Sequence, residues 1–333
     1  MKVKDIGERR LLKRLHRFCP PGVIGDDAAI IPSTEAGKKL VVTADLLVDG
    51  VHFSDRTTSP RDAGWRATAA NLSDLAAMGA WPMGIGITLG LTGNTEVSWV
   101  EELYEGIVEC LEPYKTPIIG GDVARSPVIS ISITAFGEVA ADRAILRSSC
   151  QPGNVIIATG FHGSSRAGLE LLLNPELGEE LPEAERRYLL KAHQRPRARL
   201  DILPVFWSLL NECQSSVVIG GMDSSDGLAD AIVQMCQTSQ VGARIDRNQI
   251  PISSTLSKLI DDKQALDWAL YGGEDFELVL SMPAEIGQQL VKKIGEGAAI
   301  VGTTTSDTQI LLTDSQGMHS EEELTPRQAF QHF

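Results

Sequence analysis

Seven acidic sites stand out in this sequence, most of them directly after a glycine or at the end of an apolar run. In chain order they are Asp26-Asp27, Asp45, Asp74, Asp122, Asp223, Asp226 and Glu274-Asp275. A neighbouring glycine lets the backbone approach a ligand closely, because glycine has no Cβ and tolerates positive φ. Oxygen ligands without His or Cys are the set that Mg²⁺ prefers. The pattern therefore predicts a magnesium site built from carboxylates.

Each acidic residue also has an ordinary structural interpretation. An aspartate after glycine is commonly a turn residue or a helix N-cap, and Asp226, which precedes an apolar helix, suits the second role. Asp74 suits neither, because a carboxylate between Leu72 and Leu75 in an Ala-rich helix is costly unless another group pairs with it.

The sequence holds none of the common nucleotide-binding or hydrolase signatures. It has no G-x-x-x-x-G-K-[ST], no G-x-G-x-x-G after a strand, no G-x-S-x-G and no H-E-x-x-H. A cluster of carboxylates repels a nucleoside triphosphate unless divalent ions lie between the two. Such an arrangement suits phosphoryl transfer, in which metal ions neutralise the developing charge and the protein mainly positions the reactants.

Composition limits the remaining classes of protein. The chain has 333 residues, 43% of them hydrophobic and 22% charged, which predicts a globular protein of two domains. Its net charge of −14 argues against a protein that coats nucleic acid or an anionic membrane, since both need surplus positive charge. The five cysteines include no C-x-x-C pair, which indicates reduced thiols in a cytoplasmic protein. We expect no signal peptide and no membrane span, because the N-terminus lacks an apolar run and no 18 consecutive residues are apolar.

Strands and helices that mix along the chain must position the acidic residues. Apolar and β-branched runs predict strands at 28–31, 40–43 (ending at Asp45), 83–91, 128–136, 155–159, 241–245 and 276–280. Helical spacing predicts helices at 4–18, 61–79 and 97–112, after the glycine-rich segment near 163, after Asp226, and within 284–304. A polar stretch at 140–153 marks a boundary, so we expect two α/β or α+β domains, residues 1–145 and 146–333.

Seven motifs occur in order along nearly the whole chain: GDDAAII (25–31), TADLLVDGVHF (43–53), NLSDLAAMGAWP (71–82), GGD (120–122), TGFHGSSRAGL (159–169), SDGLAD (225–230) and GGEDFEL (272–278). Together they resemble the thiamine-monophosphate kinase family of the aminoimidazole ribonucleotide synthetase-like superfamily. The resemblance implies the two-domain fold of that superfamily and ATP-dependent phosphorylation of thiamine monophosphate to thiamine diphosphate, with several Mg²⁺ ions. It also implies a homodimer whose N-terminal domains bind ATP and metal and join their sheets across the two-fold axis, while each C-terminal domain closes over the site.

The resemblance assigns roles to single residues as well. The implied metal ligands are Asp27, Thr43, Asp45, Asp74, Asp122, Asp223 and Asp226. The implied nucleotide contacts are Tyr104, Gly121, Asp122, Arg147 and Ser225, and the implied substrate contacts are His52, Glu274 and Phe330. No general base is assigned, because the acceptor phosphate is already ionised, so transfer is expected to be direct and in line.

Some of these positions have competing interpretations or depart from the family pattern. Tyr104 fits the apolar face of the helix at 97–112, His52 a core histidine, Arg147 a surface charge and Phe330 a hydrophobic latch. Ala44 replaces a hydroxyl residue of the family and Ser224 an apolar one, but no departure removes a carboxylate.

Other functions remain as alternatives. Sister activities of the superfamily are phosphorylation of selenide, of a formylglycinamidine substrate, or of a carbamoyl group in hydrogenase maturation. Cys19, followed by two prolines, lacks the setting that selenide chemistry needs, and the last cysteine, Cys236, is not C-terminal as hydrogenase maturation requires. A non-catalytic protein that binds magnesium nucleotide is the alternative from another class, although carboxylates kept without a metal would only destabilise the site.

Overall fold

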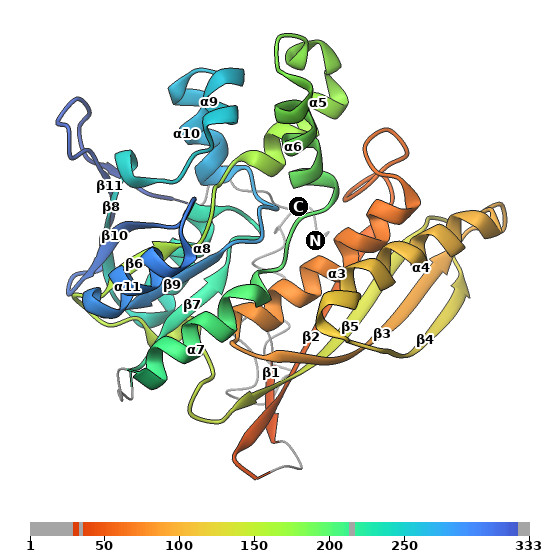
Figure 1. The fold of residues 1–333 in the computed structure, drawn as a ribbon, viewed down its shortest axis with the longest axis horizontal. Helices are drawn as coiled ribbons and strands as arrows, with labels where there is room; N and C mark the ends of the chain where they lie inside the picture. Colours follow the sequence, from red (N-terminus) through yellow and green to blue (C-terminus); the bar gives the residue numbers. More distant parts are fainter. Residues whose placement is uncertain (1–28, 33–35, 213–216, 326–333) are drawn as a thin grey trace, which may run out of the picture.

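A computed structural model of the chain describes residues 29–32, 36–212 and 217–325. Figure 1 shows two β-sheets side by side, each with helices packed against it. Both halves of the chain thus combine helices and strands, as the sequence predicts. No helix within these residues is long and apolar enough to cross a membrane.

The N-terminal sheet has five strands in the order β1-β2-β5-β3-β4. Their bounds are β1 (Ala29–Pro32), β2 (Lys38–Val48), β3 (Trp81–Leu91), β4 (Ile118–Arg125) and β5 (Ser130–Ala140). Neighbouring strands are antiparallel except for the parallel pair β3 and β4. Helices α3 (Pro60–Ala77) and α4 (Val97–Leu111) cover one face, so alternate residues of β5 such as Ile131 and Ile133 are buried beneath them.

Two glycines bring the backbones of α3 and α4 into direct contact. A Cβ at Gly64 of α3 would lie 2.0 Å from the carbonyl oxygen of Leu103, and one at Gly106 of α4 would lie 1.8 Å from that of Arg61. Ser59 caps the start of α3 by accepting a hydrogen bond from the Asp62 amide at 3.2 Å. The helix is therefore fixed in place along its first half.

The C-terminal sheet has seven strands in the order β12-β11-β8-β10-β6-β9-β7. Their bounds are β6 (Val155–Ala158), β7 (Gly220–Asp223), β8 (Gly242–Asp246), β9 (Leu278–Met282), β10 (Ala299–Thr305), β11 (Ile310–Thr313) and β12 (Glu322–Glu323). The helices of this half are α5 (Ser164–Leu173), α6 (Glu183–Gln194), α7 (Ile202–Glu212), α8 (Leu228–Ser239), α9 (Ser254–Leu259), α10 (Asp262–Tyr271) and α11 (Ala284–Ile294). One apolar core continues from the N-terminal sheet through α7 to β9 and α11, so the two halves share buried surface.

Three local expectations are wrong. Strand β2 does not end at Asp45, because its pairing with β5 continues for three further residues, to Val48. Gly120-Gly121-Asp122 lies within strand β4 and not in a turn, since it pairs along β3. The N-cap of α8 is Gly227 and no side chain caps that helix, so the capping interpretation of Asp226 fails. The expected helix at 4–18 lies outside the described residues, as do Asp26, Asp27 and Phe330.

Candidate active site

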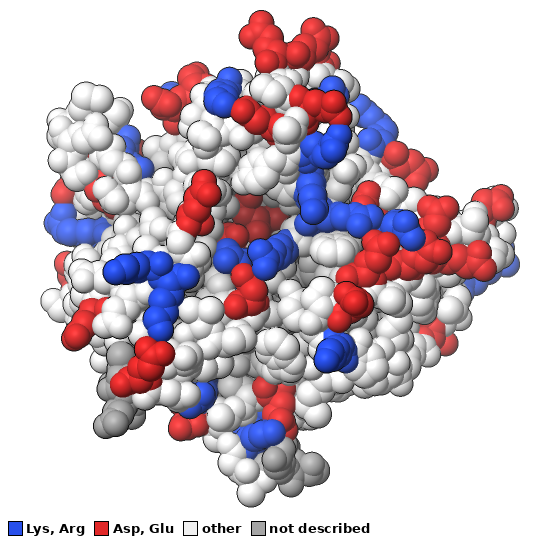
Figure 2. All heavy atoms as spheres, viewed as in Figure 1, with Lys and Arg blue, Asp and Glu red and all other residues white. Residues whose placement is uncertain are grey.

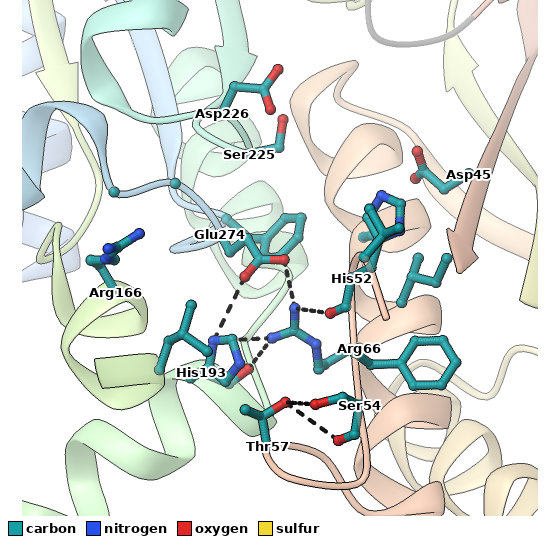
Figure 3. A pocket seen from close by; sticks show the side chains of 18 of the residues that line it. Asp45, His52, Ser54, Thr57, Arg66, Arg166, His193, Ser225, Asp226 and Glu274 are labelled. Atoms are coloured by element: carbon teal, nitrogen blue, oxygen red, sulfur yellow. Dashed lines mark hydrogen bonds and ion pairs between the residues drawn. The ribbon is translucent and has the colours of Figure 1, made fainter. Parts of the chain in front are cut away.

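A cavity of about 650 Å³ opens between the two halves of the chain. Its lining combines β2, the loop after β2 and α3 of the N-terminal half with α5, α6 and two loops of the C-terminal half. Figure 2 shows this region as a hollow with acidic side chains recessed in it and basic ones at its rim. Figure 3 shows the lining side chains from close by.

Four of the predicted aspartates line one end of the cavity: Asp45 on β2, Asp74 on α3, Asp223 at the end of β7 and Asp226 in the loop before α8. The hydroxyl of Thr43 donates a hydrogen bond to Asp74 Oδ2, which supplies the partner that a carboxylate in this helix needs. Strand β7 and the loop before α8 bring the other two carboxylates to the same end.

Asp223 is the most deeply buried of the four. Burial raises the pKa of Asp223 to about 6, against the effects of a hydrogen bond from Ser73 Oγ (2.6 Å) and of the nearby Arg147, which lower it. The negative charges of Asp45 and Asp226 raise this pKa further. Carboxylates that repel one another in this way favour a cation between them.

The donor set at this end fits Mg²⁺, although the described side chains do not form a complete coordination site by themselves. Across the described ranges, no three or more His, Cys, Asp or Glu side chains are arranged to hold an ion by themselves. Magnesium is usually bound by one or two carboxylates together with waters and substrate phosphates. The aspartates therefore fit an ion that enters with a phosphorylated ligand.

The loop 272–277 also lines the cavity, next to the loop of Ser225 and Asp226, and has an unusual backbone. Glu274 and Phe276 have φ values of 59° and 51°, which residues other than glycine rarely adopt. The Glu274 amide donates to the carbonyl of Ser225 at 2.7 Å. Asp275 accepts hydrogen bonds from the amides of Gly163 (2.7 Å) and Ser165 (2.9 Å), and burial raises its pKa to about 7. These bonds hold Glu274 toward the cavity.

His52 lies in the loop after β2 of the N-terminal half, on the opposite side of the cavity from Glu274 (Figure 3). The Val48 amide donates a hydrogen bond to its Nδ1 at 3.0 Å, so the neutral ring carries its hydrogen on Nε2. Two predicted substrate contacts, His52 and Glu274, therefore line the same cavity as the aspartates.

Other predicted residues lie elsewhere. Gly121 and Asp122 are exposed on the edge strand β4, and Asp122 lies opposite Thr88, on the sheet face away from α3. Tyr104 packs against the core beneath α4, as its alternative interpretation predicts. None of the three lines the cavity. Arg147 is half-buried, donates to Gln234 Oε1 at 2.8 Å and lies near enough to Asp223 to lower its pKa.

Sequence analysis missed three cationic or titratable residues of the lining: Arg66 on α3, Arg166 on α5 and His193 on α6. One signal was present, since Arg66 precedes Asp74 by about two helical turns and therefore shares its helix face. The positions of Arg166 and His193 depend on how the halves meet, and no local pattern reports that.

Comparisons with known proteins agree along the whole chain. Family profiles described as the N-terminal and C-terminal domains of AIR synthase related protein match residues 25–139 and 151–315. A thiamine-monophosphate kinase of Synechococcus elongatus is 46% identical, over 99% of this chain and 98% of that one. The Escherichia coli thiamine-monophosphate kinase is 37% identical, over 78% of this chain and 76% of that one.

Solved structures give the same result. A structure described as AaThiL complexed with AMPPCP and TMP superposes with a TM-score of 0.83 at 31% identity, covering 100% of this chain and 99% of that chain. A HypE–HypF complex superposes with a TM-score of 0.74 at 14% identity, over 96% of this chain and 99% of that one, which shows a shared fold alone.

Proposed function

Because the chain belongs to the thiamine-monophosphate kinase family of AIR synthase-related proteins, we propose that it transfers the γ-phosphoryl group of ATP directly to the phosphate of thiamine monophosphate. The product is thiamine diphosphate. The cavity carries this proposal, because its lining combines four aspartates with His52 and Glu274. The predicted family and two-domain fold are confirmed by full-length relatives.

At the acidic end, Asp45, Asp74, Asp223 and Asp226 would hold Mg²⁺, with Thr43 beside Asp74. An ion held by these aspartates would supply positive charge to balance that of the phosphates. Asp27 and Asp122 are proposed metal ligands on the basis of their motifs alone, since Asp122 lies outside the cavity lining. Ser225, Arg147, Gly121 and Tyr104 are proposed nucleotide contacts, and Ser225 lines the cavity next to Asp226.

In the same cavity, His52 and Glu274 would bind the thiamine part of the acceptor, with Phe330 as a further proposed contact. The neutral His52 ring can donate from Nε2, and the Glu274 carboxylate can accept from a substrate N–H. Neither residue needs to remove a proton, because the attacking phosphate oxygen is ionised near neutral pH. These residues therefore bind and orient the acceptor, and the mechanism needs no covalent phosphoenzyme.

ADP release tests the function when it is measured with thiamine monophosphate, with thiamine and with no acceptor. We expect rapid release with thiamine monophosphate alone. ATP–ADP isotope exchange without acceptor tests whether the phosphoryl group is transferred directly, since exchange would indicate a phosphoenzyme. Release that is equally fast with no acceptor would contradict the proposed function.

His52→Asn should raise the KM for thiamine monophosphate more than it lowers kcat. Asparagine keeps a hydrogen-bond donor but not the imidazole ring, so binding is weakened while the reacting phosphates keep their surroundings. Steady-state kinetics measure the two constants separately. A large fall of kcat at unchanged KM would instead make His52 a proton-transfer catalyst.

We also propose that residues 1–145 form a nucleotide-binding and dimerisation domain and that residues 146–333 close over the site. The uncovered face and edge of the N-terminal sheet support a homodimer. Strand β4 is an exposed edge that carries Ile119 and Val123, with 59% and 60% of their surface exposed. Trp81 and Met83 of β3 add further exposed apolar surface. Apolar edge strands of this kind are normally covered by a partner.

Val123→Lys combined with Ile119→Lys should convert the dimer into a monomer, because two charges would be buried in the sheet-to-sheet contact. Light scattering after gel filtration measures the mass. Val97→Lys is the matched control, since Val97 is 71% exposed at the start of α4, and its mass should stay dimeric. A wild-type protein of monomer mass would contradict the proposal.

A cytoplasmic location is part of the same proposal. Three cysteines of the described chain, Cys110, Cys150 and Cys236, are buried free thiols. This supports a protein of a reducing compartment.

A further inference from the structure

Arg66 contacts three of the segments that line the cavity, those of His52, His193 and Glu274. Its side chain extends from α3 and is 3% exposed. One terminal nitrogen donates to Glu274 Oε1 at 2.5 Å and lies 3.4 Å from the carbonyl oxygen of His52. The other donates to the carbonyl oxygen of His193 at the end of α6. Figure 3 shows the guanidinium at the centre of these contacts.

The three partners belong to different parts of the chain. His52 lies in the loop after β2 of the N-terminal half, whereas His193 and Glu274 belong to the C-terminal half. Glu274 is 208 positions away from Arg66 in the sequence. A planar guanidinium with several fixed donors can hold such partners at one mutual geometry, which a lysine ammonium cannot.

The contacts with Arg66 use only one oxygen of the Glu274 carboxylate. Glu274 Oε2 lies 3.6 Å from His193 Nδ1, beyond hydrogen-bond distance, and accepts no hydrogen bond from the described residues. Burial and the nearby charges of Arg66 and Arg166 lower the pKa of His193 to about 2, so its ring is neutral. Arg66 therefore supplies the positive charge that balances the Glu274 carboxylate, through the ion pair with Oε1.

We propose that Arg66 is a positioning residue for the acceptor, which aims Glu274 Oε2 into the cavity and sets the distance between the His52 and Glu274 loops. This inference rests on the proposed function and adds a residue to it. Arg66 acts through Glu274 and His52 and not on the reacting phosphates. Its loss should consequently weaken binding of thiamine monophosphate while ATP binding and turnover change little.

Arg66→Met should raise the KM for thiamine monophosphate by about 10- to 100-fold, the loss expected when a charge-assisted hydrogen bond is removed. Arg66→Lys should give an intermediate KM, because lysine restores the ion pair with Glu274 but not the fork of donors. The KM for ATP and kcat should each stay within about threefold of wild type, since the acidic end is unchanged.

Arg195→Met is the matched control. Arg195 also joins the two halves, through ion pairs with Asp62 (2.5 Å) and Glu109 (3.0 Å), but it lies outside the cavity lining. We expect this variant to keep wild-type KM for both substrates. If it raises the KM for thiamine monophosphate as much as Arg66→Met does, Arg66 is only one of several contacts that hold the halves together, and the proposal is wrong.

A double-mutant cycle with Glu274→Gln tests the route of action. If Arg66 acts through Glu274, Arg66→Met combined with Glu274→Gln should raise KM little more than the larger single change. Fully multiplicative effects would overturn the proposal, as would an Arg66→Met variant with wild-type KM. Either result is distinct from failure of the proposed function, in which wild-type protein would release no ADP in response to thiamine monophosphate.

Discussion

Asp74→Asn is expected to lower kcat by about 100- to 1,000-fold while the protein stays folded. The substitution removes a negative charge that would hold the metal ion, and the ion would in turn stabilise the transferring phosphoryl group. Asparagine retains an oxygen that can accept the hydrogen bond from Thr43, so the packing around α3 is kept. Asp226→Asn should behave alike, and its thermal midpoint should be close to wild type because Gly227, not Asp226, is the N-cap of α8. Single-turnover kinetics and thermal unfolding measure the two effects.

Asp267→Asn is a suitable control for this pair, since Asp267 is an exposed aspartate on α10. Its kcat should equal that of wild type. Wild-type rates in Asp74→Asn or Asp226→Asn would show that the carboxylates are structural residues of a turn and a helix, and would remove the basis of the proposed metal sites.

Chelation of divalent metal should abolish ATP binding almost completely, with affinity falling at least about 100-fold. Asp45, Asp74 and Asp226 would otherwise face the triphosphate at close range, and each repulsion between unit charges 4 Å apart costs about 1 kcal/mol even in water. The sequence provides no P-loop lysine to offset this repulsion.

Titration calorimetry with a non-hydrolysable ATP analogue, in excess EDTA and then in excess Mg²⁺, measures this dependence. Because no described group of side chains holds an ion alone, metal and nucleotide should bind cooperatively. Tight binding of the analogue in EDTA would contradict the role assigned to the acidic end.

Local signals singled out Asp74 and Asp223, and both line the cavity. The glycine pair that precedes Met222 and Asp223, and the apolar helix around Asp74, can each be recognised within a few residues. The end of β2 was misplaced for the opposite reason. Whether a strand continues past Asp45 is decided by its pairing with β5, about ninety residues later in the chain.

Long-range geometry also explains why Arg66 was missed and why Asp122 does not join the cluster. The one local signal for Arg66 is its spacing from Asp74 on α3, and this does not report a partner as remote in sequence as Glu274. Asp122 has the expected glycine pair before it, but strand pairing places it opposite Thr88 on the uncovered face of the sheet. The motif alone does not specify the face of the sheet.

The close backbone contacts at Gly64, against Leu103, and at Gly106, against Arg61, fix the position of α3. Arg66 and Asp74 lie eight residues apart on this helix, which corresponds to about 12 Å along its axis. Peptide hydrogen bonds set that length, and the backbone contact with α4 prevents the helix from sliding. The spacing of Arg66 and Asp74 is therefore fixed within one helix, and we expect the proposed site to favour acceptors of matching length as well as of matching chemical groups.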